Sequence, residues 1–183
     1  MSLSEPKRRE LSHTRTLEIK GYARDDGLWD IEGHLTDVKP YAYSGDDTPR
    51  AAGEPIHDMW LRLTIDETFL VHEAEAFTAN GPYFVCAEIN PNFAALKGLR
   101  IGPGWNRNAR ERVGGTKGCT HLFEMLGQMG TTAMQTLWAV QTEKRDEDPD
   151  KPREAPAGLL NSCHAYRSDG PIVARDYPGS VGK

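Results

Sequence analysis

The chain has 183 residues, of which 27 are acidic and 22 basic, and its net charge at pH 7 is −5. This length corresponds to one domain that can bury a core, and because the charge is acidic with no basic block, we expect no nucleic acid partner. No apolar run approaches the roughly 20 residues that span a bilayer, and no signal-peptide stretch follows the N-terminal charges, so we expect a soluble protein without a membrane partner. Three widely spaced cysteines favour a reducing, cytoplasmic setting over a disulfide framework.

The N-terminal part of the chain predicts a β-hairpin. Residues 1–14 are polar and are predicted to form a disordered arm, and an alternating run begins at Thr16. The Asp26-Gly27 pair indicates a type I′ turn, because aspartate and glycine tolerate the positive φ angles that this turn needs. The partner strand, residues 28–38, places its side chains alternately on two faces. One face carries Trp29, Ile31 and Leu35, and the other carries Asp30, Glu32, His34 and Thr36.

Two further strands are predicted after a long loop. Residues 39–56 are rich in glycine, proline and aspartate, which is typical of a lid or a mobile connection. The run from Met59 to Ile65 alternates apolar and polar side chains, and a short turn at residues 66–68 returns the chain as the strand 69–79. We expect the strands to form one antiparallel sheet with one face that needs cover.

Helices are predicted to supply this cover. Cys86, Ile89, Phe93 and Leu96 recur at helical spacing, with Asn90-Pro91 as a kink or a fresh start and Gly98 as the stop. After a glycine-rich loop, residues 106–113 predict a short basic helix, and a long helix is predicted from about Cys119 to Lys144.

The last part of the chain predicts a loop and a second hairpin. Residues 145–156 indicate a solvated loop, Asp169-Gly170 indicates a turn between short strands that rejoin the sheet, and residues 179–183 indicate a frayed tail. The predicted fold is therefore α+β, with one domain at residues 15–178. We expect an antiparallel sheet of about four to six strands covered on one face by two or three helices.

Cofactor signatures are absent from the sequence. It contains no dinucleotide or P-loop glycine motif, no C-x-x-C pair and no H-E-x-x-H, so we expect no cofactor. What remains is a set of acid/base groups that could exchange protons without one, because histidine titrates near neutrality and carboxylates orient it. The candidate catalytic residues are Glu32, His34, Asp37, His57, Asp58 and His121. For the polar face of the second strand, an ordinary solvated sheet surface is the alternative.

Four residues are candidates for substrate binding. Trp60 and Trp105 could stack on a flat ligand, although core packing is the other role open to each. Arg110 supplies positive charge near the start of the long helix. Cys119 stands where that helix begins, so it is either a reactive thiol or a small packing residue. A metal site is the alternative use of this region, with Cys119, His121, Cys163 and His164 as ligands suited to zinc.

Several long blocks resemble those of a known family. The blocks DGLWDIEGHLTD, PIHDMWLRLTID, GLRIGPGW, GCTHL and CHA are similar to those of an uncharacterised bacterial family known as a domain of unknown function, over about Arg15 to Tyr166. The resemblance implies a setting in aromatic-compound catabolism, with lignin-derived compounds among the substrates. A vaguer likeness in the order of elements is to iron–sulfur scaffold proteins of the IscU type, whose cysteine pattern only Cys86 and Cys119 fit.

Two functions are consistent with these features. The first is a cofactor-independent lyase or isomerase that acts on a small aromatic compound by retro-aldol-type chemistry. In it His34 or His57 takes a proton, Asp37 or Asp58 orients the base, and His121 with arginine charge steadies an oxyanion. The alternative is a scaffold or binding protein that holds zinc or an iron–sulfur cluster. An exposed sheet edge favours a homo-oligomer, with a homodimer as the default.

Overall fold

A computed structural model of the chain describes residues 3–45, 47–143, 152–156 and 158–183. It divides into two compact units, Met1–Leu137 and Trp138–Lys183.

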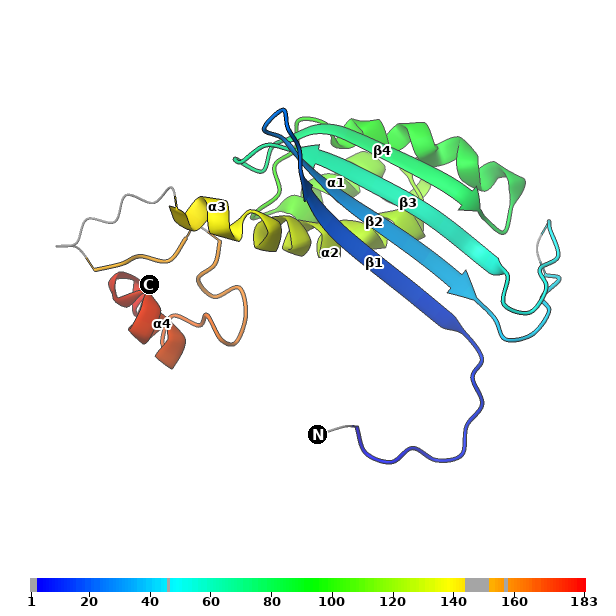
Figure 1. The fold of residues 1–183 in the computed structure, drawn as a ribbon, viewed down its shortest axis with the longest axis horizontal. Coiled ribbons are helices and arrows are strands. Elements are labelled where there is room, and N and C mark those ends of the chain that lie inside the picture. Colours follow the sequence, from blue (N-terminus) through cyan, green and yellow to red (C-terminus); the bar gives the residue numbers. More distant parts are fainter. Residues whose placement is uncertain (1–2, 46, 144–151, 157) are drawn as a thin grey trace. The chain divides into compact units, whose positions relative to one another are not determined.

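The first unit contains one antiparallel sheet of four strands in the order β1-β2-β3-β4. The strands are β1 (Thr14–Ala23), β2 (Trp29–Val38), β3 (Pro55–Ile65) and β4 (Val71–Asn80). Helices lie on one side of this sheet (Figure 1). The predicted α+β class, with an antiparallel sheet covered by helices, is therefore confirmed.

The turn between β1 and β2 differs from the prediction. Gly27 has a positive φ of 81°, but Asp26 does not, so this is not a type I′ turn, which needs two such residues. The backbone N–H of Arg24 instead donates to the carbonyl of Leu28 over 2.9 Å, so three residues lie between the last paired positions. This longer turn sets the register that places Arg15 opposite Asp37.

Four helical segments follow β4 in the first unit. They are η1 (Phe84–Leu96), α1 (Trp105–Val113), η2 (Gly115–Lys117) and α2 (Thr120–Thr136), of which η1 and η2 are 3₁₀ helices. The predicted helix around Phe93 is present but is a 3₁₀ helix, with Pro91 inside it. Proline has no N–H to donate, which is consistent with a helix that is not a regular α-helix here. In the structure, α2 packs against β1, β2 and β3, and η1 packs against β4.

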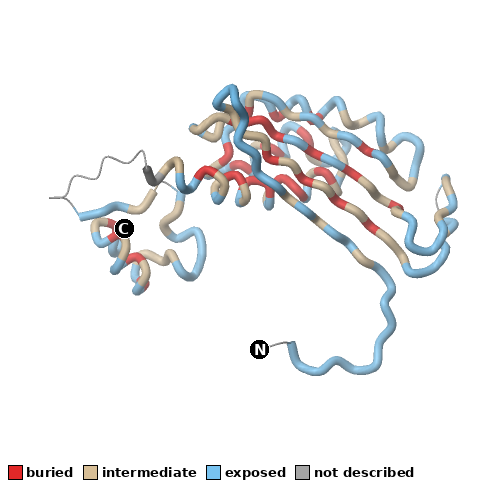
Figure 2. Tube along the Cα trace, in the orientation of Figure 1, coloured by how far each residue is buried: buried red, intermediate tan, exposed pale blue. Residues whose placement is uncertain are grey.

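The core lies between the sheet and these helices (Figure 2). It includes odd-numbered residues of β2 and β3 and the apolar stripe of α2, together with buried residues of β4, η1 and α1; among them are Ile31, Leu35, Met59, Leu61, Leu63, Leu122, Met125 and Met129. Burying one such side chain contributes about 1.5–3 kcal/mol. Gly33 lets α2 approach the sheet closely, because a Cβ there would lie 3.2 Å from the Met129 sulfur.

The predicted long helix is wrong in its length. It ends at Thr136, with Leu137 as its C-cap, and a separate helix α3 (Trp138–Glu143) follows in the second unit. The apolar spacing continues through Leu137 and Trp138, so periodicity alone cannot detect the break. Lys144, the predicted end, lies outside the described residues.

The predicted C-terminal hairpin is also wrong. Residues 152–156 and 158–183 contain no strand; they hold turns, α4 (Pro171–Asp176) and η3 (Pro178–Ser180). Gly170 is the N-cap of α4 and Pro171 its first residue, a position where the fixed φ of proline favours helix. Of the predicted loop 145–156, residues 145–151 lie outside the described residues. In the described part of the chain, no helix combines the length and apolarity needed to cross a membrane.

Candidate active site

A buried carboxylate, Asp37, lies at the end of β2 on the face that the helices cover. Its side chain is only 1% exposed. Arg15, its neighbour on β1, donates from Nε to Oδ1 over 2.9 Å and from Nη2 to Oδ2 over 2.8 Å. His13 Nε2 lies 2.8 Å from Oδ1. A buried carboxylate is costly unless it is paired and hydrogen-bonded, and these contacts satisfy it.

The same contacts keep Asp37 ionised. Burial by itself would raise the pKa of this carboxyl group, but the hydrogen bonds from Arg15 and His13 outweigh burial and lower the pKa to about 2. Asp37 therefore carries its negative charge throughout the physiological range.

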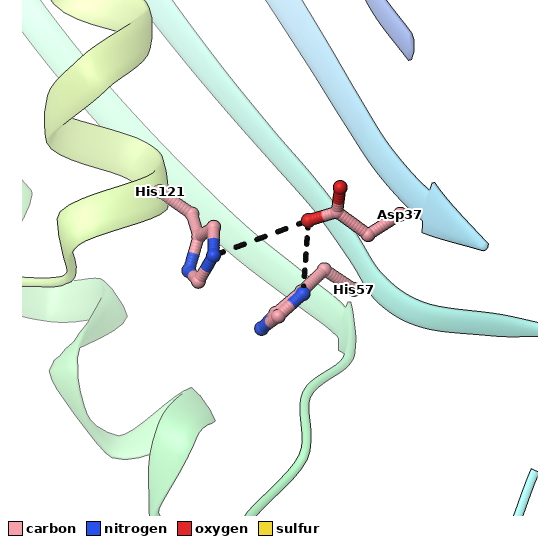
Figure 3. Close-up of side chains that lie close together, drawn as sticks. All are labelled: Asp37, His57 and His121. Atoms are coloured by element: carbon pink, nitrogen blue, oxygen red, sulfur yellow. Dashed lines mark ion pairs between the residues drawn. The ribbon is translucent and has the colours of Figure 1, made fainter. Parts of the chain in front are cut away.

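Two histidines meet at the Oδ2 atom of Asp37 (Figure 3). His57 is the direct cross-strand partner of Asp37 on β3, and its Nδ1 atom lies 3.0 Å from Oδ2. His121 is the second residue of α2, and its Nε2 atom lies 3.9 Å from the same oxygen. The two imidazole centroids are 3.8 Å apart with the ring planes tilted by 35°. Strand pairing and the docking of α2 thus bring three distant positions into one cluster.

Both imidazoles are neutral at pH 7. Burial lowers the pKa of His57, and the neighbouring His121 lowers it further, while Asp37 acts in the opposite direction. Burial also lowers the pKa of His121, and the charge of Arg15 adds to this effect. A neutral imidazole has a free lone pair that can take a proton, so each ring is a potential general base.

One nitrogen of the cluster lacks a hydrogen bond. Nδ1 of His57 is buried and has no hydrogen-bond partner among the described residues, since Asp37 Oδ2 lies within reach but not in line with it. A buried polar atom without a partner is rare and often marks a functional site. The hydrogen bonds of catalytic groups are often poorly aligned before substrate binds.

The side chains of Glu124 and Cys119 also border the cluster. Arg15 also donates from Nη1 to Oε2 of Glu124, one turn along α2 from His121, over 3.0 Å. Cys119 is the N-cap residue of α2, and its sulfur lies 3.8 Å from Nδ1 of His121. With His13, the group of side chains around Asp37 therefore contains two carboxylates, three imidazoles, a guanidinium and a thiol.

A metal ion is the other use that these three ligands could have. One ligand atom from each of Asp37, His57 and His121 lies within 4.8 Å of the others. Two imidazoles that bind one ion through bonds of about 2.0–2.1 Å need ring centroids roughly 4.5–5 Å apart. The observed centroid separation is 3.8 Å, and Asp37 Oδ2 already accepts from Arg15. The two rings lie closer together than binding of one shared ion allows, so in this arrangement the residues do not fit a resident metal.

The metal ligands predicted from the sequence are divided between the two units, with Cys119 and His121 in the first. Cys163 and His164 belong to the second unit, where they lie in turns rather than on the predicted strand. Among the described residues, no cluster of three potential metal ligands includes a cysteine.

The other predicted catalytic residues lie on the opposite face of the sheet. His34 Nε2 is 2.7 Å from Asp58 Oδ1, and the His34 ring stacks on Trp60 with centroids 3.7 Å apart. Glu32 pairs across the strands with Arg62. Side chains alternate along a strand, so His34 and Asp37 cannot share a face, nor can His57 and Asp58. The structure thus separates the predicted set into two groups of three.

Two further predicted substrate-binding residues, Trp105 and Arg110, make contacts outside the cluster. Trp105 is 5% exposed and donates from Nε1 to the carbonyl of Leu126, so it packs in the core. Arg110 on α1 lies over the ring of Phe123. Cys119 is the one predicted binding residue that contacts the cluster.

Sequence analysis did not identify His13 and Arg15 as site residues. His13 falls in the stretch predicted to be a disordered arm, and β1 begins directly after it at Thr14. The available signal was a histidine and an arginine two residues apart, which share one face of an extended chain. Their target, Asp37, becomes apparent only when the register of β1 and β2 is known.

Comparison with known protein families identifies a match over most of the chain. Residues 13–135 match the family described as "Protein of unknown function (DUF2889)". No curated protein and no solved structure matches the chain. The match covers every residue of the cluster, from His13 to Glu124, and ends before Cys163 and His164. The predicted resemblance to a family of unknown function is confirmed.

Proposed function

The chain belongs to the DUF2889 family, and we propose that it is a cofactor-independent enzyme, a lyase or isomerase that acts on a small aromatic compound. The proposed reaction is of the retro-aldol type, in which a carbon–carbon bond beside a hydroxyl group is broken. The aromatic substrate class rests on the family resemblance of the sequence blocks. The chemistry rests on the cluster around Asp37.

One observation carries this proposal: two adjacent, neutral imidazoles lie against one ionised, buried carboxylate. In the proposed mechanism, His57 is the base. Nδ1 of His57 faces Asp37, and its other ring nitrogen points away from Asp37 (Figure 3). Asp37 orients the ring and stabilises the imidazolium that forms when this second nitrogen takes the hydroxyl proton of the substrate.

Bond cleavage then requires a place for negative charge. As the substrate hydroxyl loses its proton, its oxygen forms a carbonyl, the carbon–carbon bond breaks, and the electron pair moves into an enolate. We assign His121 and Arg15 to steady this enolate oxygen, because the positive charge of Arg15 acts on both rings. Protonation of the enolate carbon by His57 completes the reaction and restores the neutral base. No oxidant or reductant is needed.

The test is an assay for carbonyl release from aromatic β-hydroxy ketones, with products identified by mass spectrometry. We expect turnover by the wild-type protein and a loss of about a hundredfold or more in His57→Asn, which is the usual scale for removing a general base. Asp37→Asn should lower the rate by a comparable factor.

His34→Asn is the matched control, because His34 also pairs with an aspartate but lies on the other face of the sheet. We expect it to retain the wild-type rate. Full activity in His57→Asn with a cooperative thermal melt would contradict the proposal, and so would an equal loss of activity in His34→Asn.

A further inference from the structure

Cys119 occupies a position that the proposed reaction does not use. Its sulfur lies 3.8 Å from Nδ1 of His121 and 4.0 Å from the sulfur of Met59. The opposite nitrogen of His121, Nε2, faces the buried Asp37 at 3.9 Å. A thiol, an imidazole and a carboxylate therefore follow one another in the order nucleophile, base and orienting group.

We propose that Cys119 is a nucleophilic thiol, activated by His121, that forms covalent adducts with the carbonyl carbon of small aldehydes. The inference does not depend on the proposed lyase reaction, because adduct formation needs no turnover.

The histidine tautomer required for this step agrees with the geometry. In this tautomer Nε2, which faces Asp37 Oδ2, carries the proton, and Nδ1, which lies 3.8 Å from the Cys119 sulfur, carries the lone pair. His121 is neutral at pH 7 and can therefore accept the thiol proton, and Asp37 then stabilises the imidazolium. Both distances are longer than those of tight hydrogen bonds, as is common for catalytic groups without substrate.

The start of α2 offers a place for the developing oxyanion. Cys119 is the N-cap residue of this 17-residue helix and makes no side-chain capping hydrogen bond. The first backbone N–H groups of an α-helix have no partner within the helix, and they point towards the N-cap. An oxygen bonded to the carbon that Cys119 attacks would lie near these donors, where the helix dipole favours negative charge.

The step balances without an added reagent. The sulfur forms a bond to the carbonyl carbon, the π electrons move to the oxygen, and the thiol proton passes through His121 to that oxygen. The S–H group is thereby added across the carbonyl group, and a hemithioacetal results. The addition is reversible.

The experiment compares the three cysteines of the full chain, which are all reduced. The protein is treated with iodoacetamide at pH 7, and the alkylation rate at each cysteine is measured by peptide mass spectrometry. Cys163 is exposed and Cys119 is only partly exposed, so access alone predicts faster labelling of Cys163. We expect Cys119 to react at least about tenfold faster than Cys163, because the adjacent base takes up its proton.

Two further arms test the base and the ligand class. His121→Asn should reduce labelling of Cys119 about tenfold or more and leave Cys163 unchanged, whereas His72→Asn, a substitution of a surface histidine, should change neither. Preincubation of the wild-type protein with benzaldehyde should slow the labelling of Cys119 only.

Slower labelling of Cys119 than of Cys163 in the wild-type protein would overturn the proposal, whatever the variants do. Fast labelling that benzaldehyde does not slow would overturn the assignment to aldehydes. Loss of lyase activity in His57→Asn with unchanged labelling of Cys119 would support both proposals separately.

Discussion

Replacement of Asp37 by asparagine removes the one charge around which the cluster is arranged. The pKa of Asp37 is lowered from 3.8 to about 2, and each pKa unit corresponds to about 1.4 kcal/mol, so the folded surroundings favour the carboxylate by roughly 2.5 kcal/mol. Breaking a fully buried ion pair typically costs about 3–5 kcal/mol. Arg15 is 39% exposed and can regain water, so we expect Asp37→Asn to lower the free energy of unfolding at pH 7 by about 2–3 kcal/mol.

The pH dependence gives this prediction a distinctive form. A carboxyl group whose pKa is lowered by folding stabilises the fold above its unfolded pKa, and this stability is lost as the pH falls towards its folded pKa. The difference between wild type and Asp37→Asn should therefore persist from pH 7 to about 4 and shrink between pH 4 and pH 2. Urea denaturation at a series of pH values measures it.

Asp26→Asn is the matched control for this experiment. Asp26 also pairs with an arginine, Arg24, through two hydrogen bonds, but both side chains lie at the surface. Exposed ion pairs contribute little, so we expect a nearly unchanged urea midpoint. Equal stabilities of wild type and Asp37→Asn at pH 7 would refute the reasoning, as would a difference that remained full-sized at pH 2.

Three other predictions follow from the same cluster. Because burial lowers the pKa of both His57 and His121, the unfolded chain binds more protons than the folded chain below pH 6.5, and the free energy of unfolding should fall as the pH drops from 7 to 5. In urea denaturation, His57→Gln should reduce this pH dependence. An unchanged pH dependence would contradict the burial effect. Dialysis against a chelator should leave the rate of carbonyl release unchanged. Stoichiometric zinc or iron, found by elemental analysis of the purified protein, would contradict a cofactor-independent mechanism. His34→Ala should leave the turnover number within a fewfold of wild type, and a hundredfold loss would move the active site to the other face of the sheet.

The sheet could be predicted because its signals are local. The alternation of Met59, Leu61 and Leu63 with polar residues marks β3, and the same two-residue period marks β2. The hairpin was also predictable, but its register was not. A two-residue turn at Asp26-Gly27 would place Arg15 opposite Val38, whereas the observed turn places it opposite Asp37. A slip of one residue exchanges the two faces of a strand, so the pairing of Arg15 with Asp37 could not be predicted.

The sequence predicts the acid/base residues of the candidate site, but neither their grouping nor the roles of His13 and Arg15. Asp37, His57 and His121 were all named as acid/base candidates, together with His34. The alternation that separates His34 from Asp37 could be read from the sequence, since residues three apart on a strand face opposite ways. The pairing of Asp37 with His57 could not, because a long loop and a register shift at Asp37 lie between β2 and β3. The docking of α2, which brings in His121, is set by packing across the whole sheet.

Exchange of carbon-bound hydrogen with solvent tests the central claim most directly. An enzyme that protonates an enolate must also catalyse the reverse step, so 4-hydroxyacetophenone incubated with the protein in D₂O should gain deuterium at its methyl group, as followed by ¹H NMR. We predict that wild type accelerates this exchange at least about a hundredfold over His57→Asn, whereas His34→Asn exchanges at the wild-type rate. Exchange at the buffer rate in the wild-type protein, or equal exchange in wild type and His57→Asn, would contradict a proton-transfer centre at Asp37, His57 and His121.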